Sequence, residues 1–110
     1  MRMWMVNPKQ MCSKHLLGEH VECHMFAKII LKGISLKGYQ EKGLFQSDCL
    51  VSRHDELANE MIGRGMNHTS PLKLRRTKGI PKGIVDKKKS MLELQSRCKE
   101  CKARMMENAL

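Results

Sequence analysis

The sequence predicts an all-α protein: a compact bundle of about three helices, with a basic loop between the second helix and the third. Two observations support this class. Apolar residues recur at helical steps of three and four in three separate stretches, and no stretch alternates apolar and polar residues as a half-exposed strand does. The length of 110 residues suits one domain with one core, so we expect residues 1–110 to form a single domain.

The first helix is expected over residues 7–31. Pro8 suits a first helical turn, and Asn7 is a suitable residue to cap it. Apolar residues occupy most sides of this segment, which indicates a helix at the centre of the fold. Glycines over residues 33–43 predict that a loop with turns follows.

The second helix is expected to begin at Ser52, because Ser52 and Asp55 have the spacing of a capping motif, and to end at residues 63–65. Prolines and glycines over residues 70–83 then predict a loop. The third helix is expected to run from Asp86, as its cap, to the C-terminus. One packing face of that helix is marked by apolar residues at steps of three and four: Met91, Leu94, Cys98, Cys101 and Met105.

Positive charge is the first indication of function. Lysine and arginine number 21 against 11 acidic residues, and residues 69–89 alone hold eight basic residues against one acidic residue. Clustered positive charge is typical of proteins that bind DNA or RNA, although a solvated basic face is the alternative. The candidate DNA-binding residues are Arg64, Lys73, Arg75, Arg76, Lys78 and Lys82.

The same composition excludes other classes. No apolar run approaches the roughly 18 residues of a membrane span, and the first residues lack the apolar core of a secretory signal. An odd number of cysteines, five, indicates free thiols in a reducing compartment. We therefore expect a cytoplasmic protein without membrane association.

Two groups of residues raise the question of a metal. Cys98 and Cys101 form a Cys-x-x-Cys pair, but a closed zinc site needs four ligands, and the chain has no second pair of this kind. Both thiols also fall on the packing face of the third helix, so we expect core thiols. His20 and His24 lie one turn apart, with no third ligand evident. The sequence therefore predicts no metal and no cofactor.

Three polar residues interrupt the apolar first helix. His15, Glu19 and Glu22 are spaced to lie along one stripe of it. Glu22 is flanked by Val21 and Cys23, and burial among such neighbours raises a carboxyl pKa, which suits a general acid or base. The alternative is a salt bridge to a nearby lysine or arginine, and the pattern alone favours that alternative.

A resemblance to a known family rests on two blocks. Residues 14–22, which read K-H-L-L-G-E-H-V-E, resemble the signature helix of the pyrimidine-dimer DNA glycosylases, the phage endonuclease V family, approximately Q-H-L-M-A-E-Y-R-E-L. Residues 53–67 are similar to a family stretch with R-x-x-E-L followed by K-R-G-F-N. The blocks lie in the family's order and cover about a third of the chain. The family's compact three-helix bundle agrees with the class predicted above.

The resemblance implies a DNA glycosylase and AP lyase that acts on pyrimidine-dimer-type lesions in duplex DNA. In the family, the α-amine of the N-terminal residue attacks the sugar C1′ and forms a Schiff base; that position here is Met1. The glutamate that ends the signature helix assists glycosyl cleavage and β-elimination, and here it is Glu22. Arg2, His15 and Glu19 are expected to support these two groups.

The family chemistry needs no metal or cofactor, and the implied partner is damaged double-stranded DNA, bound by a monomer in a bacterial or phage-infected cell. Val21 and Met25 stand where the family has arginines that hold phosphates. Two other functions stay open: a non-catalytic basic DNA-binding protein on the same scaffold, and a small phage-type interaction protein whose charge serves a protein partner.

Overall fold

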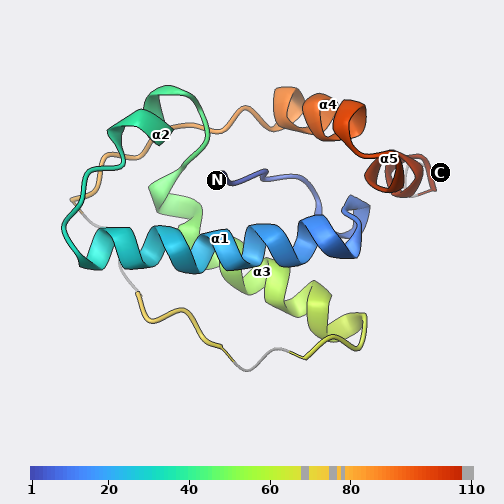
Figure 1. The fold of residues 1–110 in the computed structure, drawn as a ribbon, viewed down its shortest axis with the longest axis horizontal. Coiled ribbons are helices and arrows are strands. Elements are labelled where there is room, and N and C mark those ends of the chain that lie inside the picture. Colours follow the sequence, from blue (N-terminus) through green and yellow to red (C-terminus); the bar gives the residue numbers. More distant parts are fainter. Residues whose placement is uncertain (68–69, 75–76, 78, 108–110) are drawn as a thin grey trace.

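Helix α1 (Ser13–Leu31) is the central element of the fold in the computed structural model, with the other helices arranged around it (Figure 1). The structure describes residues 1–67, 70–74, 77 and 79–107. Within these ranges the chain is helical and contains no strand, which confirms the all-α class. The remaining helices are α2 (Lys37–Glu41), α3 (Leu50–Gly63), α4 (Lys87–Arg97), α5 (Lys99–Glu107) and the short 3₁₀ helices η1 (Pro8–Gln10) and η2 (Ser47–Cys49).

The core lies where α3 crosses α1 (Figure 1). Side chains of α1 such as Leu16 and Phe26 and side chains of α3 such as Leu50 and Leu57 are completely buried there. Phe45, from the segment before η2, stacks at a tilt on Phe26 with ring centroids 4.7 Å apart. The apolar residues that predicted the first two helices are therefore the residues that join them.

Two helix starts differ from the prediction. The Asn7 side chain accepts a hydrogen bond from the Lys9 backbone N–H, so it caps η1, and the extended backbone of Cys12 separates η1 from α1. The second helix begins at Leu50, before Ser52. The Ser52 hydroxyl donates to the Cys49 carbonyl, so Ser52 does not act as the predicted cap. Apolar periodicity places a helix along the chain, but the hydrogen bonds at its ends fix its first residue.

The expected third helix is two helices. Asp86 caps α4 as predicted, since its side chain accepts from the Lys89 N–H at 3.0 Å. The helix then stops at Arg97, because Cys98 has extended backbone angles of φ −130° and ψ 113°, and α5 starts at the next residue. The described residues between α3 and α4 contain no helix, in agreement with the predicted loop.

The N-terminal segment, residues 1–7, passes between α1 and α4 (Figure 1). The Met3 N–H donates to the Leu44 carbonyl at 2.7 Å, and the Ser90 hydroxyl donates to the Trp4 carbonyl at 2.5 Å. The side chain of Met3 is completely buried. A left-handed residue, Met5 with φ 58°, then turns the chain towards η1. This path fixes the position of Met1 relative to α1.

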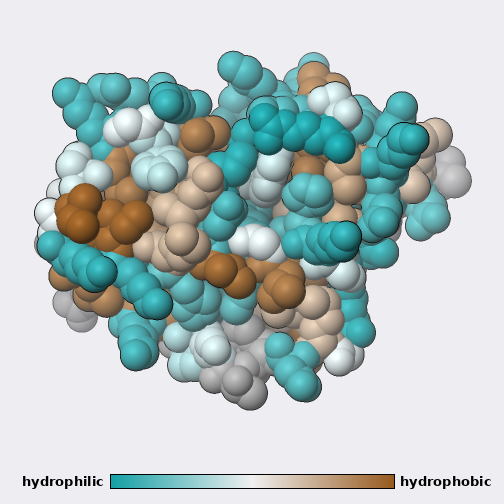
Figure 2. Space-filling model, viewed as in Figure 1, coloured by the Kyte–Doolittle hydropathy of each residue, from teal (hydrophilic) through white to brown (hydrophobic). Residues whose placement is uncertain are grey.

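The surface is mostly hydrophilic, with some apolar side chains exposed along the course of α1 (Figure 2). Leu17, Val21 and Met25 are each nearly half exposed and lie one turn apart. In the part of the chain that the structure describes, no helix has the length and apolar character to cross a membrane.

Candidate active site

A cleft of about 1030 Å³ opens between the N-terminal segment, α1, α4 and the loop after α2. Met1 and Glu22 both line it, and the Met1 amine lies 4.0 Å from Glu22 Oε1. Burial raises the pKa of Glu22 above its usual value, although the Arg2 backbone N–H and the positive N-terminus act in the opposite direction. A carboxyl group with a raised pKa, next to an amine and open to solvent, is suited to proton transfer.

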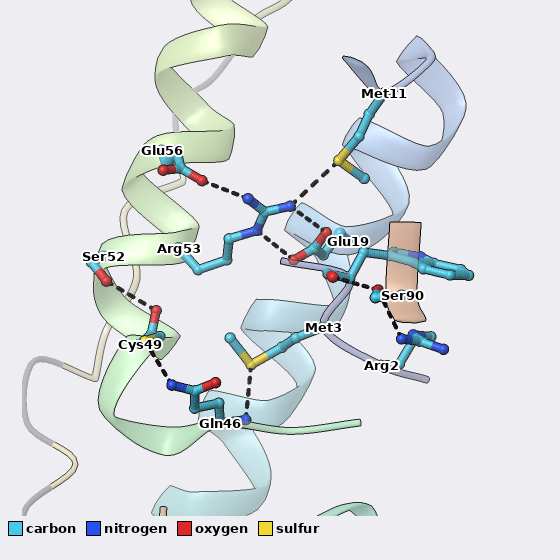
Figure 3. Close-up of polar contacts among 11 residues, drawn as sticks. Arg2, Met3, Met11, Glu19, Gln46, Cys49, Ser52, Arg53, Glu56 and Ser90 are labelled. Atoms are coloured by element: carbon cyan, nitrogen blue, oxygen red, sulfur yellow. Dashed lines mark hydrogen bonds and ion pairs between the residues drawn. The ribbon is translucent and has the colours of Figure 1, made fainter. Parts of the chain in front are cut away.

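Arg2 holds the start of the chain against α4. Its guanidinium donates to the Ser90 hydroxyl at 2.9 Å (Figure 3). It also donates to Glu93 Oε2 at 2.7 Å. The same guanidinium lies over the Trp4 ring, 4.0 Å from its centroid. Because Ser90 also donates to the Trp4 carbonyl, one turn of α4 fixes both Arg2 and Trp4. These contacts anchor the residue that directly follows the predicted nucleophile.

The predicted stripe of His15, Glu19 and Glu22 lines the cleft, but each residue has a different partner. Glu19 is buried and accepts hydrogen bonds from Arg53 Nε at 2.6 Å and Nη2 at 2.8 Å (Figure 3). His15 Nδ1 lies 3.2 Å from the sulfur of Cys12. Glu22 pairs with the Met1 amine, in place of the lysine or arginine partner that the pattern favoured.

Arg53 was not identified as a functional or structural residue from the sequence. Its guanidinium is almost completely buried, and it also donates to Glu56 and to the sulfur of Met11. It therefore connects α3 to α1 and to the residue that follows η1. A buried charge needs such a set of partners. Two signals in the sequence pointed to Arg53: it is the arginine of the second block of the resemblance, and it could complement Glu19.

The three predicted DNA-binding residues that the structure describes, Arg64, Lys73 and Lys82, lie in different places. Arg64 is committed to internal contacts, since it pairs with Glu60 and donates to the backbone carbonyls of Pro8 and Met11. Lys73 is exposed on a segment that lies across α1 from the N-terminus in Figure 1. Lys82 is exposed beside a hollow that adjoins the cleft. The other three predicted residues lie outside the described part of the chain: Arg75, Arg76 and Lys78.

Four other basic side chains line the cleft that holds Met1: Lys14, Lys42, Lys89 and Arg97. All four are exposed, and they come from different parts of the chain. Lys89 is the last residue of the basic segment 69–89, whereas charge clustering did not single out the other three, which are separated in sequence. Five acidic residues line the same cleft, so the charges around the amine are mixed: Glu19, Glu22, Glu41, Asp86 and Glu93. Val21 and Met25, at the family's arginine positions, are exposed and apolar.

In three dimensions, both candidate metal groups gain residues that the sequence did not place beside them. His54 supplies the third residue that the sequence lacked beside His20 and His24, and His24 Nε2 lies 3.2 Å from His54 Nε2. The Cys98 and Cys101 pair also meets a second pair, because Cys12 and His15 lie against it. The second pair was missed because one of its members is a histidine.

Comparison with known protein families matches residues 1–74 to the family described as pyrimidine dimer DNA glycosylase. The matched segment contains Met1, Arg2, the signature helix and the second block of the resemblance. Searches of curated proteins and of solved structures returned no match. A match over about two thirds of the chain, with both expected blocks inside it, identifies this protein as a member of the pyrimidine dimer DNA glycosylase family.

Proposed function

We propose that this chain is a DNA glycosylase that also acts as an AP lyase, with the Met1 α-amine as nucleophile and Glu22 as general acid and base. The observation that carries this proposal is the 4.0 Å separation of the Met1 amine and Glu22 Oε1 inside an open cleft. Family membership supplies the coarser part, a glycosylase with DNA as its substrate. The α-amine of a peptide titrates close to neutral pH, so a nucleophilic neutral fraction is available.

The first half of the reaction releases the base. The amine lone pair attacks C1′ of the damaged nucleotide, and the bond from C1′ to the base nitrogen breaks with its electron pair passing to the base, which takes up a proton. The amine loses a proton, and the C1′–O4′ bond then opens. This gives a C1′=N Schiff base and a protonated O4′. Glu22 lies where it can accept the proton of the amine and return one to a leaving group.

The second half cleaves the strand. The Schiff base makes the C2′ hydrogens acidic, and the carboxylate of Glu22 acts as the general base that removes one of them. The resulting electron pair expels the 3′ phosphate by β-elimination. Water then hydrolyses the imine and restores the Met1 amine. The raised pKa of Glu22 suits both halves, because the group must hold a proton in one step and accept it in another.

The surroundings of the cleft fit a DNA substrate. Lys14, Lys42, Lys89 and Arg97 line it, and lysine and arginine are the side chains that neutralise backbone phosphates. We propose that Lys82 extends this surface along the adjoining hollow. The clamp of Arg2 on Ser90 and Glu93 holds the amine in place while the substrate binds, which lowers the entropic cost of attack.

Replacement of Glu22 by glutamine tests the assignment. Glu22→Gln keeps the shape and removes the titratable group, so base release from a duplex with one pyrimidine dimer should slow by about 10²–10⁴-fold under single-turnover conditions. DNA affinity should change little. Glu107→Gln, at an exposed carboxylate near the end of α5, is the matched control and should keep the wild-type rate.

Two outcomes would contradict the proposal in different ways. A wild-type rate in Glu22→Gln would remove Glu22 from the chemistry. A wild-type protein that binds the duplex but releases no base and cuts no strand would be the non-catalytic DNA-binding protein that the sequence left open.

A further inference from the structure

Four potential metal ligands converge beside the start of α1: Cys12, His15, Cys98 and Cys101. Their three sulfurs and one ring nitrogen all lie within 4.8 Å of one another. The Cys12 and Cys98 sulfurs are 3.8 Å apart, and His15 Nδ1 is 3.6 Å from the Cys101 sulfur and 3.2 Å from the Cys12 sulfur. In a tetrahedral zinc site, bonds of about 2.3 Å to sulfur and 2.0–2.1 Å to nitrogen place two sulfurs about 3.8 Å apart and a sulfur and a nitrogen about 3.6 Å apart.

We propose that these four residues bind a structural zinc ion. Three thiolates and one imidazole complete a closed tetrahedral set, and thiolate-rich tetrahedral sites select zinc over the hard cations. No ligand position is left for water or substrate. The ion would therefore stabilise the fold and take no part in the chemistry at Met1.

The two ligand pairs are built in the same way. Cys12 and Cys98 each precede a helix and have extended backbone, with φ −68° and ψ 161° at Cys12 and φ −130° and ψ 113° at Cys98. His15 and Cys101 follow three residues later, in the first turns of α1 and α5. Two helix N-termini thus meet at the cluster, and their partial positive charge favours thiolates. The break between α4 and α5 places Cys98 at such a terminus.

Backbone groups around the cluster support thiolate ligands as well. The Cys12 N–H donates to the sulfur of Cys101 at 3.2 Å, and the Cys101 N–H donates to the sulfur of Cys98 at 3.5 Å. Hydrogen bonds to ligand atoms orient them and stabilise their charged form. The first backbone N–H groups of a helix have no partner within the helix, and here the N–H groups of Cys12 and Cys101 donate to sulfur.

Cys23 shows what a packing thiol looks like in the same chain. It is completely buried in α1, and burial raises its pKa well above the usual range. In the four-residue cluster Cys12 and Cys101 are buried too, but His15 and Cys98 are only partly buried. The difference from Cys23 is that an imidazole nitrogen there faces two sulfurs. A sulfur separation of 3.8 Å is also far beyond a disulfide bond of about 2.05 Å. Core packing was the expectation from sequence, and this geometry favours a metal site instead.

The site would connect the two ends of the chain. Cys12 and His15 lie at the junction of η1 and α1, whereas Cys98 and Cys101 lie at the junction of α4 and α5. Helix α5 packs on η1, and the His15 ring meets the Trp4 ring edge-on at 6.0 Å. Zinc would thus hold α4, and with it the partners of Arg2, against the segment that carries Met1.

Metal analysis of the purified protein tests this directly. We expect one zinc ion per chain in native mass spectrometry. After replacement by Co²⁺, we expect sulfur-to-metal charge-transfer bands in the near ultraviolet and the d–d bands of a tetrahedral site in the visible spectrum. A strong chelator should lower the melting temperature, and added zinc should restore it. Cys98→Ser and Cys101→Ser should lose the metal. Two control variants should keep it: Cys49→Ser, at a thiol outside the cluster, and His24→Ala, in the group of three histidines.

Three results would overturn the proposal: a wild-type protein that binds no zinc even after addition of the ion, a melting temperature that a chelator does not change, or zinc that Cys98→Ser retains and His24→Ala loses. If the cysteine variants do not fold, the zinc content and the cobalt spectrum of the wild-type protein decide the question. All of these measurements are independent of glycosylase activity.

Discussion

The ionised carboxylate of Glu22 is partly buried, and burial is the largest of the influences that raise its pKa. A carboxyl group whose pKa is higher in the folded than in the unfolded protein favours folding at pH values below its unfolded pKa. That contribution is lost as the pH rises through the folded pKa. The residue needed for proton transfer is therefore one that costs stability at neutral pH.

The pH dependence of unfolding should reflect this cost. We expect Glu22→Gln to melt at the same temperature as the wild type or higher at pH 7, with its advantage shrinking as the pH falls through the raised pKa of Glu22 towards the usual range of glutamate. Scanning calorimetry of both proteins between about pH 4 and pH 7 measures this. A lower melting temperature for Glu22→Gln at pH 7 would mean that its ion pair with the amine mainly stabilises the helix.

The partners of single residues were the hardest feature to predict from sequence. Spacing placed His15, Glu19 and Glu22 on one stripe of a helix, and they do share one side of α1. Periodicity cannot say that Glu19 meets Arg53 or that His15 meets Cys12, since these partners depend on how the N-terminal segment and α3 approach α1. The pattern made Glu22 a candidate general acid or base but favoured a salt bridge, and the resemblance then implied the catalytic role.

At the scale of helices, the buried pair of Glu19 and Arg53 joins α1 to α3. Arg53→Met should destabilise the protein by about 3–5 kcal/mol, because it leaves the buried Glu19 carboxylate without its partner. Glu56→Gln removes the exposed partner of the same arginine and should cost about 1 kcal/mol or less. Urea unfolding followed by circular dichroism compares the two. Equal losses would show that the buried pair has no special role in joining the helices.

Helix positions were more predictable than helix boundaries. The central helix and the second helix follow from apolar periodicity, and α4 begins at the predicted Asp86 cap. Helix α2, in contrast, lies within residues 33–43, where a loop was predicted. The break at Cys98 was also not predicted, because apolar spacing continues through Cys101 and Met105 and no glycine or proline marks the interruption. If zinc binds as proposed, its coordination by Cys98 explains the break between α4 and α5. A search for Cys-x-x-Cys pairs alone could not have predicted this, because the second ligand pair is a cysteine and a histidine.

At the scale of the whole molecule, a net charge of +10 should make DNA binding strongly dependent on salt. We propose that the surface around the cleft carries this binding. Each phosphate contact contributes about −0.9 to the slope of log K against log salt concentration, so Lys42→Ala and Lys89→Ala should each reduce the slope by about one. Fluorescence anisotropy with an undamaged duplex, repeated at several salt concentrations, measures this slope.

Lys73→Ala is the matched comparison, since it removes the same charge from a segment across α1 from the N-terminus. We expect a smaller change in slope for this variant. If Lys73→Ala flattens the slope and the two cleft variants do not, DNA binds along the basic segment that the sequence predicted. A slope near zero for the wild-type protein would instead exclude DNA binding through phosphate contacts.

The most direct test of the Met1 amine is borohydride trapping on a duplex with one abasic site. A cleavable partner fused directly to Met1 blocks the amine, and a protease that leaves Met1 as the first residue frees it in the same chain. The fused protein should still bind the duplex but form no covalent adduct, whereas the freed protein should form a stable adduct that contains the Met1 peptide. Equal trapping before and after cleavage would assign the nucleophile to another amine and contradict the mechanism.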